Sequence, residues 1–383
     1  MTAPASARRI YLDHAATSWP KPPEVAAAIA RSLTELTASA GRSGHGASLE
    51  SGKLLCETRL MAARLIGVAD ASNLIFTSGC TAALNLVLRG LLKPGDRVLV
   101  SPMEHNSVMR PLHRLNRERG VRVIAARGDE FGRVDPDNVG RLARQHHPAL
   151  AVIQHASNVN GVLQPIGALR PVLGETPLLV DAAQTLGVLP LTVEMGIDFL
   201  AASVHKGLLG PTGVGFCYVS PEHDVEPLCD GGTGTQSEST EQPIFRPDRY
   251  EAGTPNLHGI AGARGALESL VRRGALGMEK QRLTQRLIEG LRAIRGVSVL
   301  SPDDGSALCA AFRIAGQSPE ETARRLETRF GILGRPGLQC APAAHRHLGS
   351  FPHGLMRLSA GWGTTVRDIQ SAVEAVWTIA QTG

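Results

Sequence analysis

The 383-residue chain has no apolar run that approaches the ~20 residues a membrane-spanning helix needs. One of its longest, ALAVI, covers only 149–153. The first residues hold no apolar segment of signal-peptide length, so secretion is not expected. The six cysteines lack C-x-x-C spacing, which argues against a disulfide framework and a zinc ribbon. We therefore expect a cytoplasmic protein with reduced thiols and no membrane partner.

The chain also lacks three common ligand-binding motifs and any concentration of charge. G-x-G-x-x-G, G-x-x-x-x-G-K-[ST] and H-E-x-x-H are all missing. The 40 Lys and Arg against 35 Asp and Glu leave a net charge of +5, and the basic residues are scattered, which does not indicate a nucleic-acid partner. With 43% hydrophobic and 20% charged residues, the composition is that of a globular protein.

A regular alternation of short apolar runs and helical patterns begins near residue 74. The helical patterns lie near 81–92, 106–119 and 135–144. Continuous apolar strands that alternate with helices predict an α/β fold, with a mainly parallel sheet covered on both faces. The predicted strands lie at 74–78, 97–102, 122–126, 149–156, 177–184, 199–206 and 214–220.

A second, smaller unit of α+β type is predicted after a polar segment at 231–256. One long helical pattern runs over 259–294. Three strands and two helices follow it, at 297–302, 307–314, 318–331, 355–360 and 365–381. We predict a large domain at 15–258 and a small domain formed by 1–14 and 259–383.

Unusual polar residues follow several predicted strands, where ligands bind in open α/β sheets. Ser78 to Thr81 lie between a strand and a helix, and a helix N-terminus favours a phosphate. Asp181 ends an apolar strand, where a carboxylate needs a cation. Lys206 ends another strand, and burial would lower its pKa toward that of a nucleophilic amine. These three features match the needs of pyridoxal 5′-phosphate.

At this point the sequence resembles the class V, fold-type I pyridoxal-phosphate enzymes of the cysteine desulfurase and selenocysteine lyase branch. The resemblance covers nearly the whole chain and implies a large domain with a seven-stranded sheet and a smaller C-terminal domain. The matching segments are, in order, YLDHAATSWPKP (11–22), GRSGHGAS (41–48), FTSGCTAALN (76–85), MEHNS (103–107), HASNVNG (155–161), VDAAQ (180–184), SVHKGLLGPTGVGF (203–216), GGTGT (231–235) and YEAGTPN (250–256).

The resemblance implies a role for each residue of the cofactor site. Lys206 would form the Schiff base with the cofactor and move protons, His105 would stack on the pyridine ring, and Asp181 would keep the ring nitrogen protonated. Asn158 and Gln184 would hydrogen-bond the phenolic oxygen. The phosphate would be held by Cys80, through its backbone N–H, and by Thr81, Ser203, His205 and, from the partner subunit of a homodimer, Thr235.

The loop at 334–349 distinguishes among the reactions that pyridoxal phosphate permits. Arg335 and Cys340 match the family pattern R-x-G-x-x-C-A-P, whose cysteine is the nucleophile. The resemblance implies that Cys340 takes sulfur from L-cysteine as a persulfide, releases L-alanine, and passes the sulfur to an acceptor protein. Arg357 would bind the substrate carboxylate, with Asn158 and Arg335. The family usually has an Asn after the aromatic residue that is Trp362 here, but this chain has glycine.

Three alternatives to a cysteine desulfurase stay open at this point. A selenocysteine lyase would use the same residues, and another class V lyase or aminotransferase would not need Cys340. A sulfur carrier or scaffold without turnover would not need Lys206, Asp181 and His105, so their presence favours an enzyme. No metal is expected, because His345, His347 and His353 do not form a tetrahedral set with Cys340 at standard spacing.

Overall fold

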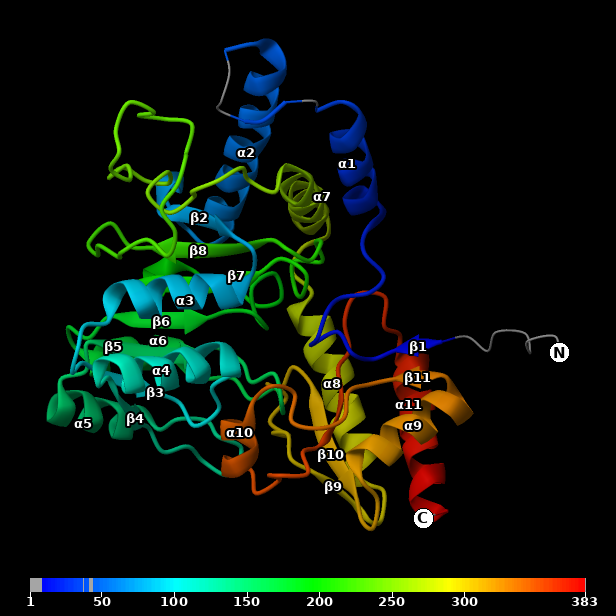
Figure 1. The fold of residues 1–383 in the computed structure, drawn as a ribbon. Helices are drawn as coiled ribbons and strands as arrows, with labels where there is room; N and C mark the ends of the chain where they lie inside the picture. Colours follow the sequence, from blue (N-terminus) through cyan, green and yellow to red (C-terminus); the bar gives the residue numbers. More distant parts are fainter. Residues whose placement is uncertain (1–8, 37, 41–43, 383) are drawn as a thin grey trace.

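A seven-stranded sheet forms the centre of the larger part of the protein in a computed structural model that describes residues 9–36, 38–40 and 44–382 (Figure 1). Its strand order is β2-β8-β7-β6-β5-β3-β4, and only β8 runs antiparallel to its neighbours. The predicted mainly parallel sheet is confirmed. The strands are β2 Leu74–Thr77, β3 Arg97–Val100, β4 Arg122–Ala125, β5 Leu150–Gln154, β6 Leu178–Asp181, β7 Phe199–Ser203 and β8 Gly215–Val219.

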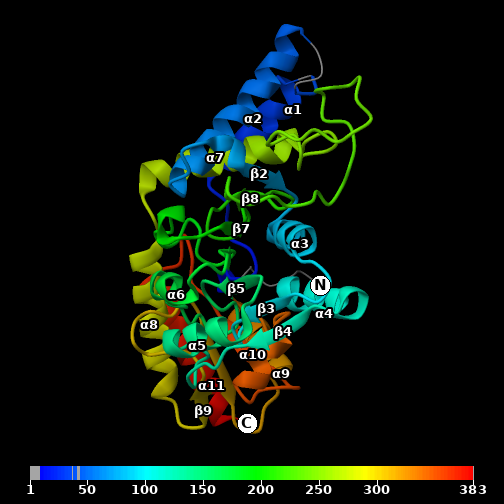
Figure 2. The ribbon, with the colours of Figure 1, turned by 90° about the vertical axis from the view of Figure 1, so that its left-hand side faces the viewer.

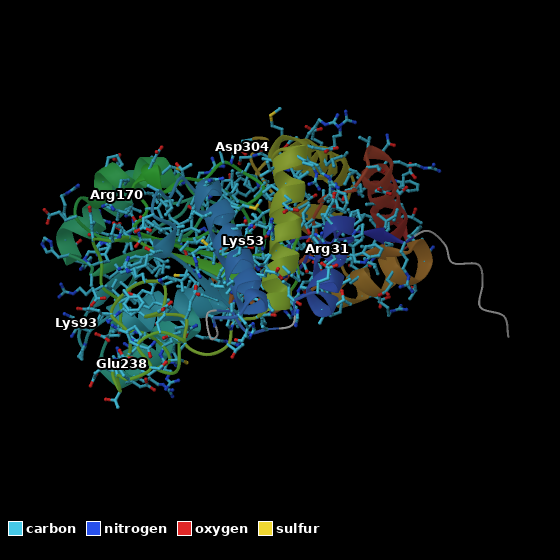
Figure 3. All side chains as sticks on the ribbon, turned by 90° about the horizontal axis from the view of Figure 1, so that it is seen from above. Arg31, Lys53, Lys93, Arg170, Glu238 and Asp304 are labelled. Carbon is cyan, nitrogen blue, oxygen red and sulfur yellow. The ribbon has the colours of Figure 1, made fainter. Side chains whose placement is uncertain are left out.

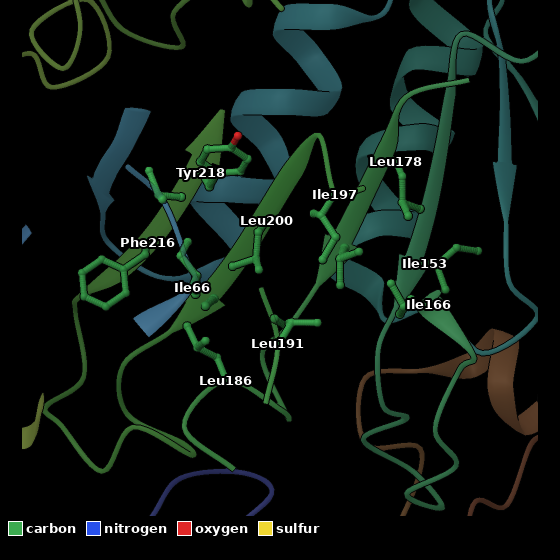
Figure 4. Close-up of a cluster of buried hydrophobic side chains, with 14 of the residues drawn as sticks. Ile66, Ile153, Ile166, Leu178, Leu186, Leu191, Ile197, Leu200, Phe216 and Tyr218 are labelled. Atoms are coloured by element: carbon green, nitrogen blue, oxygen red, sulfur yellow. The ribbon is translucent and has the colours of Figure 1, made fainter. Parts of the chain in front are cut away.

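Both faces of the inner strands of this sheet are buried, as the continuous apolar strands predict, whereas the edge strand β4 is largely exposed. In β5, Ala151 and Ile153 face one core, and Leu150 and Val152 face the other. Figure 4 shows part of the first core, which includes Ile153. One face is covered by α3 Cys80–Leu91 and α4 Asn106–Arg119, and the opposite face by α2 Gly46–Leu65, α5 Pro136–His146, α6 Ile166–Leu173 and α7 Leu257–Arg273 (Figure 2).

A smaller antiparallel sheet, in the order β12-β10-β9, forms the second unit. Side chains from the sheet and its helices share one apolar core, as Phe312, Leu287 and Val376 do. A parallel pair of strands, β1 and β11, brings the N-terminal segment beside this unit. The elements are β1 Ile10–Tyr11, α8 Gly277–Arg292, β9 Val297–Val299, β10 Ala310–Ile314, α9 Pro319–Phe330, β11 Ile332–Leu333, β12 Met356–Leu358 and α11 Val366–Gln381.

The domain division itself stays a prediction. Residues 1–8 of the predicted small domain and residues 41–43 of the segment 41–48 lie outside the described residues. Among the described residues, no helix combines the length and the apolar character needed to cross a membrane. Charged side chains such as Lys93 and Glu238 lie at the rim of the molecule when it is seen from above (Figure 3).

The predicted single helix over 259–294 is wrong, because the chain breaks it into α7 and α8 at Gly274. The backbone φ of Gly274 is +77°, a left-handed conformation that glycine adopts without steric cost. The break lets the two helices pack into different hydrophobic cores. α7 packs on α2 and on α1 Pro23–Thr34, where a Cβ at Gly265 would lie 2.6 Å from the carbonyl oxygen of Glu24. α8 packs on α11.

Three short helices also went unpredicted: the 3-10 turns Ala71–Asn73 and Val193–Met195, and α10 Pro342–His347. Each is too short to show helical periodicity in the sequence. α10 matters for the site, because it begins two residues after Cys340.

A partly buried ion pair fastens the irregular segment at 221–256 to the edge of the large sheet. The Glu251 carboxylate accepts two hydrogen bonds from the Arg59 guanidinium, at 2.6 and 2.8 Å. It also accepts a hydrogen bond from the backbone N–H of Phe76 at 2.6 Å. Phe76 lies on the edge strand β2, and this N–H is not bonded to a neighbouring strand. Bidentate, charge-assisted contacts of this kind are among the stronger hydrogen bonds in proteins.

Glu251→Ala is expected to destabilise the protein by about 2 kcal/mol, because it leaves the partly buried Arg59 guanidinium with only the Leu74 carbonyl and without a counter-charge, and leaves the Phe76 N–H without an acceptor. Thermal unfolding followed by circular dichroism measures the effect. The matched control is Glu24→Ala, which removes a partly exposed ion pair to Arg272 and should change the unfolding temperature little. Equal shifts for the two variants would show that Glu251 is not an anchor of this segment.

Candidate functional site

A cavity of about 250 Å³ opens at the carboxyl ends of β3, β5, β6 and β7. The parallel strands bring together residues that are far apart in the sequence, as expected for this architecture. Apart from Thr235, every predicted site residue lines it: Cys80, Thr81, His105, Asn158, Asp181, Gln184, Ser203, His205, Lys206, Arg335, Cys340 and Arg357.

Thr235 lies outside this cavity, on the exposed segment at 221–256. Its hydroxyl donates to the Asp248 carboxylate at 2.6 Å and contacts Thr233 at 3.0 Å. The site of its own chain therefore does not include Thr235, and its expected role across a dimer interface stays a prediction.

Asp181, the last residue of β6, presents one free carboxylate oxygen to the cavity. Its Oδ1 accepts the Cys80 thiol at 3.3 Å and the N–H of Ala183 at 2.9 Å, and no described residue donates to Oδ2. Burial, and next the Asp181 charge, raise the pKa of the Cys80 thiol well above its ordinary value. Cys80 is therefore a neutral donor to Asp181 and not a second nucleophile.

Lys206 follows β7 and lies in the same cavity as Asp181. Burial lowers the pKa of its amine, and the nearby Asp181 carboxylate opposes that shift. A larger share of the amine is therefore unprotonated and nucleophilic than for an exposed lysine.

The peptide before Lys206 is held by the N-terminal segment. The carbonyl oxygen of His205 accepts the backbone N–H of Ser18 at 2.9 Å and the ammonium of Lys21 at 3.0 Å. The hydroxyls of Thr17 and Ser18 also donate to it, at 3.1 and 3.0 Å. This crowded carbonyl limits the positions that Lys206 can take.

His105 caps the N-terminus of α4 and is neutral. Its Nδ1 accepts the backbone N–H of Ser107 at 3.0 Å. A backbone N–H can only donate, so the ring proton is on Nε2. Burial lowers the pKa of His105 to about 4, against the opposing charge of Asp181. The hydroxyl of Ser107, which sequence reasoning missed, links His105 at 2.9 Å to Thr81 at 2.8 Å.

The N-terminus of α3 and the end of β7 offer donors suited to a phosphate. We expected the N–H of Cys80 to be free for a ligand. In the structure it donates to Ser203 Oγ at 3.0 Å. The Ser203 hydroxyl proton remains available as a donor, because its oxygen is the acceptor in that bond. The Nδ1 of His205 is buried and has no hydrogen-bond partner among the described residues.

The cavity therefore fits pyridoxal phosphate on grounds of chemistry. Unpartnered buried polar atoms cost free energy until a ligand satisfies them, and His205 Nδ1 and Asn158 Oδ1 are two such atoms on residues of the cavity wall. A free carboxylate oxygen of Asp181 suits a protonated ring nitrogen, and Lys206 suits an aldehyde. Gln184, whose amide donates to the Ala15 carbonyl at 2.9 Å, lies in the same wall.

Arg357 on β12 brings the small unit into the cavity. Its side chain is buried, and its guanidinium donates to the Asn158 carbonyl at 2.6 Å and to the Asp13 carboxylate. Asp13 is a residue whose role sequence reasoning missed, although it lies in the segment 11–22. Its carboxylate forms an ion pair with the Arg357 guanidinium. Arg335 pairs with Arg357 through the backbone.

Cys340 lies at the rim of the cavity and is exposed. The backbone carbonyl of Cys340 accepts the N–H of Asn106 at 2.9 Å, which ties the loop to the beginning of α4. On the other side, the Asn158 amide donates to the Gln339 carbonyl at 2.7 Å. A thiol, a buried amine and an arginine thus share one cavity, which can bind an α-amino acid and attack its side chain.

The fold and this site define a class V, fold-type I enzyme, and the comparison with known families agrees. The family model described as "Aminotransferase class-V" matches residues 10–371, so the chain belongs to that family. The family is one of pyridoxal-phosphate enzymes.

Similar proteins place the chain among the cysteine desulfurases of this family. A probable cysteine desulfurase of Methanothermobacter thermautotrophicus is 33% identical over 98% of this chain and 95% of its own. The apo structure of the cysteine desulfurase of Thermococcus onnurineus is 29% identical, with a TM-score of 0.91 over 98% of this chain and 95% of its own. The cysteine desulfurase CsdA of Escherichia coli has a TM-score of 0.85 at 27% identity, over 98% and 95%. The predicted family is confirmed.

Asp181→Ala is expected to weaken the binding of pyridoxal phosphate and to lower turnover of L-cysteine, because the ring nitrogen would lose its anionic partner in a site of low dielectric. Titration of the cofactor-free protein with pyridoxal phosphate measures the first effect. The matched control is Asp198→Ala, which removes a carboxylate paired with Arg170 near the start of β7. It should reduce stability without changing cofactor affinity, and equal affinities for both variants would contradict the role of Asp181.

Proposed function

We propose that the protein is a pyridoxal-phosphate-dependent cysteine desulfurase that converts L-cysteine to L-alanine and keeps the sulfur as a persulfide on Cys340. The observation that carries this proposal is the shared cavity, in which an exposed cysteine lies with a partly buried lysine and a buried arginine. Without Cys340, the same cavity would suit an aminotransferase equally well.

The cofactor would be held by groups at the strand ends. Lys206 would bind its aldehyde carbon, Asp181 its ring nitrogen, and Asn158 and Gln184 its phenolic oxygen, with His105 against the ring. Thr81, Ser203 and His205 would hold the phosphate, and the Cys80 N–H would join them if it exchanged its bond to Ser203 Oγ for one to the ligand. When bound, pyridoxal phosphate withdraws electrons from the α-carbon of an amino acid. Because the pKa of Lys206 is lowered, its amine is able to accept and return the α-proton.

The substrate would be oriented by its carboxylate on the Arg357 guanidinium, which Asp13 and the Asn158 carbonyl hold rigidly. Each of the two terminal nitrogens still has one N–H that is not used in these bonds, which suits a bidentate carboxylate. Arg335 adds positive charge at the same wall.

The sulfur transfer balances without an outside oxidant or reductant. The Cys340 sulfur attacks the substrate sulfur, so a sulfur–sulfur bond forms while the substrate's carbon–sulfur bond breaks. The bonding electrons stay with the substrate carbon, which takes a proton and becomes the methyl group of alanine. The net change is L-cysteine plus the Cys340 thiol to L-alanine plus the Cys340 persulfide. The persulfide would then pass its outer sulfur to an acceptor protein or small thiol.

The proposal also includes an alternative substrate, a homodimer and a cellular location, which the shared cavity alone does not determine. L-selenocysteine would fit the same carboxylate clamp and nucleophile, so a selenocysteine lyase is the alternative enzyme. A homodimer would bring Thr235 of one chain to the phosphate of the other, which agrees with its position outside its own chain's cavity. We also infer a cytoplasmic location, where the six cysteines would stay reduced.

Lys206→Ala is expected to abolish turnover and the visible absorbance of the lysine-bound cofactor. No other lysine lines the cavity among the described residues, so no second amine can replace it. An absorbance spectrum and an alanine assay after addition of L-cysteine check this result. Lys21→Ala provides the control, because Lys21 lies outside the cavity wall and the His205 carbonyl, to which it donates together with the Ser18 hydroxyl, keeps its other donors. This variant should leave the spectrum intact. Wild-type absorbance in Lys206→Ala would overturn the cofactor site.

Cys340→Ser tests the proposed reaction itself. The variant should keep the cofactor and still respond spectrally to L-cysteine, because those steps use Lys206, Asp181 and the phosphate-binding groups. It should form no persulfide and release no sulfide in the presence of dithiothreitol, since a hydroxyl is a far poorer nucleophile toward sulfur. Selenide release from L-selenocysteine should partly survive, because selenium leaves carbon more readily.

Mass spectrometry of the wild type after treatment with L-cysteine should find the added sulfur on the peptide that carries Cys340. Cys56→Ser and Cys229→Ser are the matched controls, since both cysteines are also exposed. They should behave as the wild type does. Unchanged sulfide release from Cys340→Ser, or sulfur located on another cysteine, would contradict the proposed function.

A further inference from the structure

A buried chain of hydrogen bonds lies behind the loop that carries Cys340, and the reaction proposed above does not use it. Its members are Gln339, His345 and Ser350, all of which are less than 9% exposed. His345 is on α10 and is completely buried. Its Nε2 contacts Gln339 Oε1 at 2.9 Å, and its Nδ1 contacts Ser350 Oγ at 2.7 Å.

The direction of each bond in the chain follows from the donors. The amide nitrogen of Gln339 donates to the carbonyls of Leu355 at 2.8 Å and Arg335 at 3.2 Å, so its Oε1 is the atom left to accept. His345 must then donate from Nε2, and its Nδ1 accepts the Ser350 hydroxyl. Burial lowers the pKa of His345 to about 4, so the ring is neutral in this arrangement at neutral pH.

The hydrogen bonds of this buried chain hold a strained backbone segment. Gln339 and Cys340 have φ values of +40° and +58°, in the left-handed region that residues other than glycine seldom adopt. Two such residues in a row persist only where surrounding contacts determine them. The Gln339 side chain supplies three of those contacts, and the Asn158 amide and the Asn106 N–H hold the two carbonyls of the same segment.

These contacts connect the loop to the catalytic cavity without touching a substrate. Asn158 lines the cavity and donates to the Gln339 carbonyl, while its own carbonyl accepts from Arg357. His345 is not part of the cavity wall. Its hydrogen bond to Gln339, a residue that does line the cavity, connects it to the residue before Cys340.

We propose that His345 is a positioning residue for sulfur transfer: through Gln339 it holds Cys340 in a left-handed conformation at the rim of the cavity. The inference rests on the proposed function, because it assigns His345 to the Cys340 step alone. Loss of the hydrogen bond to Gln339 lets the loop relax, so the Cys340 sulfur spends less time within reach of the substrate sulfur. Binding of the cofactor and of L-cysteine is not affected.

Two substitutions at His345 separate this role from general stability. In His345→Gln the amide reaches the place of Nε2 and can still donate to Gln339. In His345→Asn the shorter amide reaches only the place of Nδ1, near Ser350, so the bond to Gln339 is lost. Both replace an imidazole by an amide in a buried site. His347→Asn is the matched control, because His347 lies on the same helix and, among the described residues, its side chain hydrogen-bonds to the Asp129 carbonyl, at 2.7 Å, and not to Gln339.

The measurements are kcat and KM for alanine formation from L-cysteine with dithiothreitol, together with the cofactor spectrum of each variant. We expect kcat to fall about tenfold or more in His345→Asn, as small misplacements of a reacting atom do, with KM and the spectrum unchanged. His345→Gln should recover most of the rate, and His347→Asn should match the wild type. Equal rates in the Asn and Gln variants would overturn the inference.

A second comparison uses the Cys340→Ser background. There, adding His345→Asn should leave the spectral response to L-cysteine unchanged, because no Cys340 sulfur remains to be positioned. A changed response would show that His345 acts on the cofactor or substrate site, and the inference would be wrong. If Cys340→Ser itself releases sulfide at the wild-type rate, the proposed function fails. If Cys340→Ser is inactive but His345→Asn is fully active, only the positioning role fails.

Should His345→Asn fail to fold, Gln339→Leu tests the same bond from its other end. It removes every hydrogen bond of the Gln339 side chain and leaves α10 and Ser350 in place. Because Gln339 also lines the cavity, the readouts for this variant are kcat and the cofactor spectrum. The expected result is a fall in kcat with an unchanged cofactor spectrum. A wild-type kcat would contradict the inference.

Discussion

The parallel pairing of β6 with β7 is the constraint on which the site depends. Asp181 lies opposite Ala201 in this pair, and both strands are fully buried. Their carboxyl ends therefore open at the same edge, which places the carboxylate of Asp181 and the amine of Lys206 in one cavity. The apolar side chains on both faces of the sheet hold this register, because a slip by one residue would exchange the faces of every side chain.

Burial governs the chemistry of that cavity more than any single charge does. It is the largest cause of the lowered pKa of Lys206 and of His105, and of the raised pKa of the Cys80 thiol. It also raises the pKa of Glu104, which precedes His105, to about 8. Each shift disfavours the charged form of its group. In such surroundings the charges of Asp181 and Arg357 act strongly on a ligand.

A hydrogen bond between Asn158 and Arg357 connects the two sheets at the cavity. The Asn158 carbonyl, after β5 of the large sheet, accepts from Arg357 on β12 of the small one, and Asp13 from the N-terminal segment neutralises the same guanidinium. Removing Asp13 would leave that guanidinium buried without its counter-charge, which costs more than a surface ion pair contributes. The Asn158 amide then extends the connection to the loop of Cys340.

The α/β class, the seven strands and the polar residues at their carboxyl ends could all be predicted from the sequence. Its apolar runs and ordered motifs depend on local chemistry, so Lys206, Asp181 and Cys340 could be named without coordinates. It could not predict the break at Gly274, because helical periodicity continues on both sides and only packing against separate cores shows it. Asp13, Ser107 and the chain from Gln339 to His345 were also decided by tertiary structure. Each of these residues has a hydrogen-bond partner that only the folded structure brings near. Hydrogen bonds between residues far apart in the sequence leave no periodic signal from which they could be predicted.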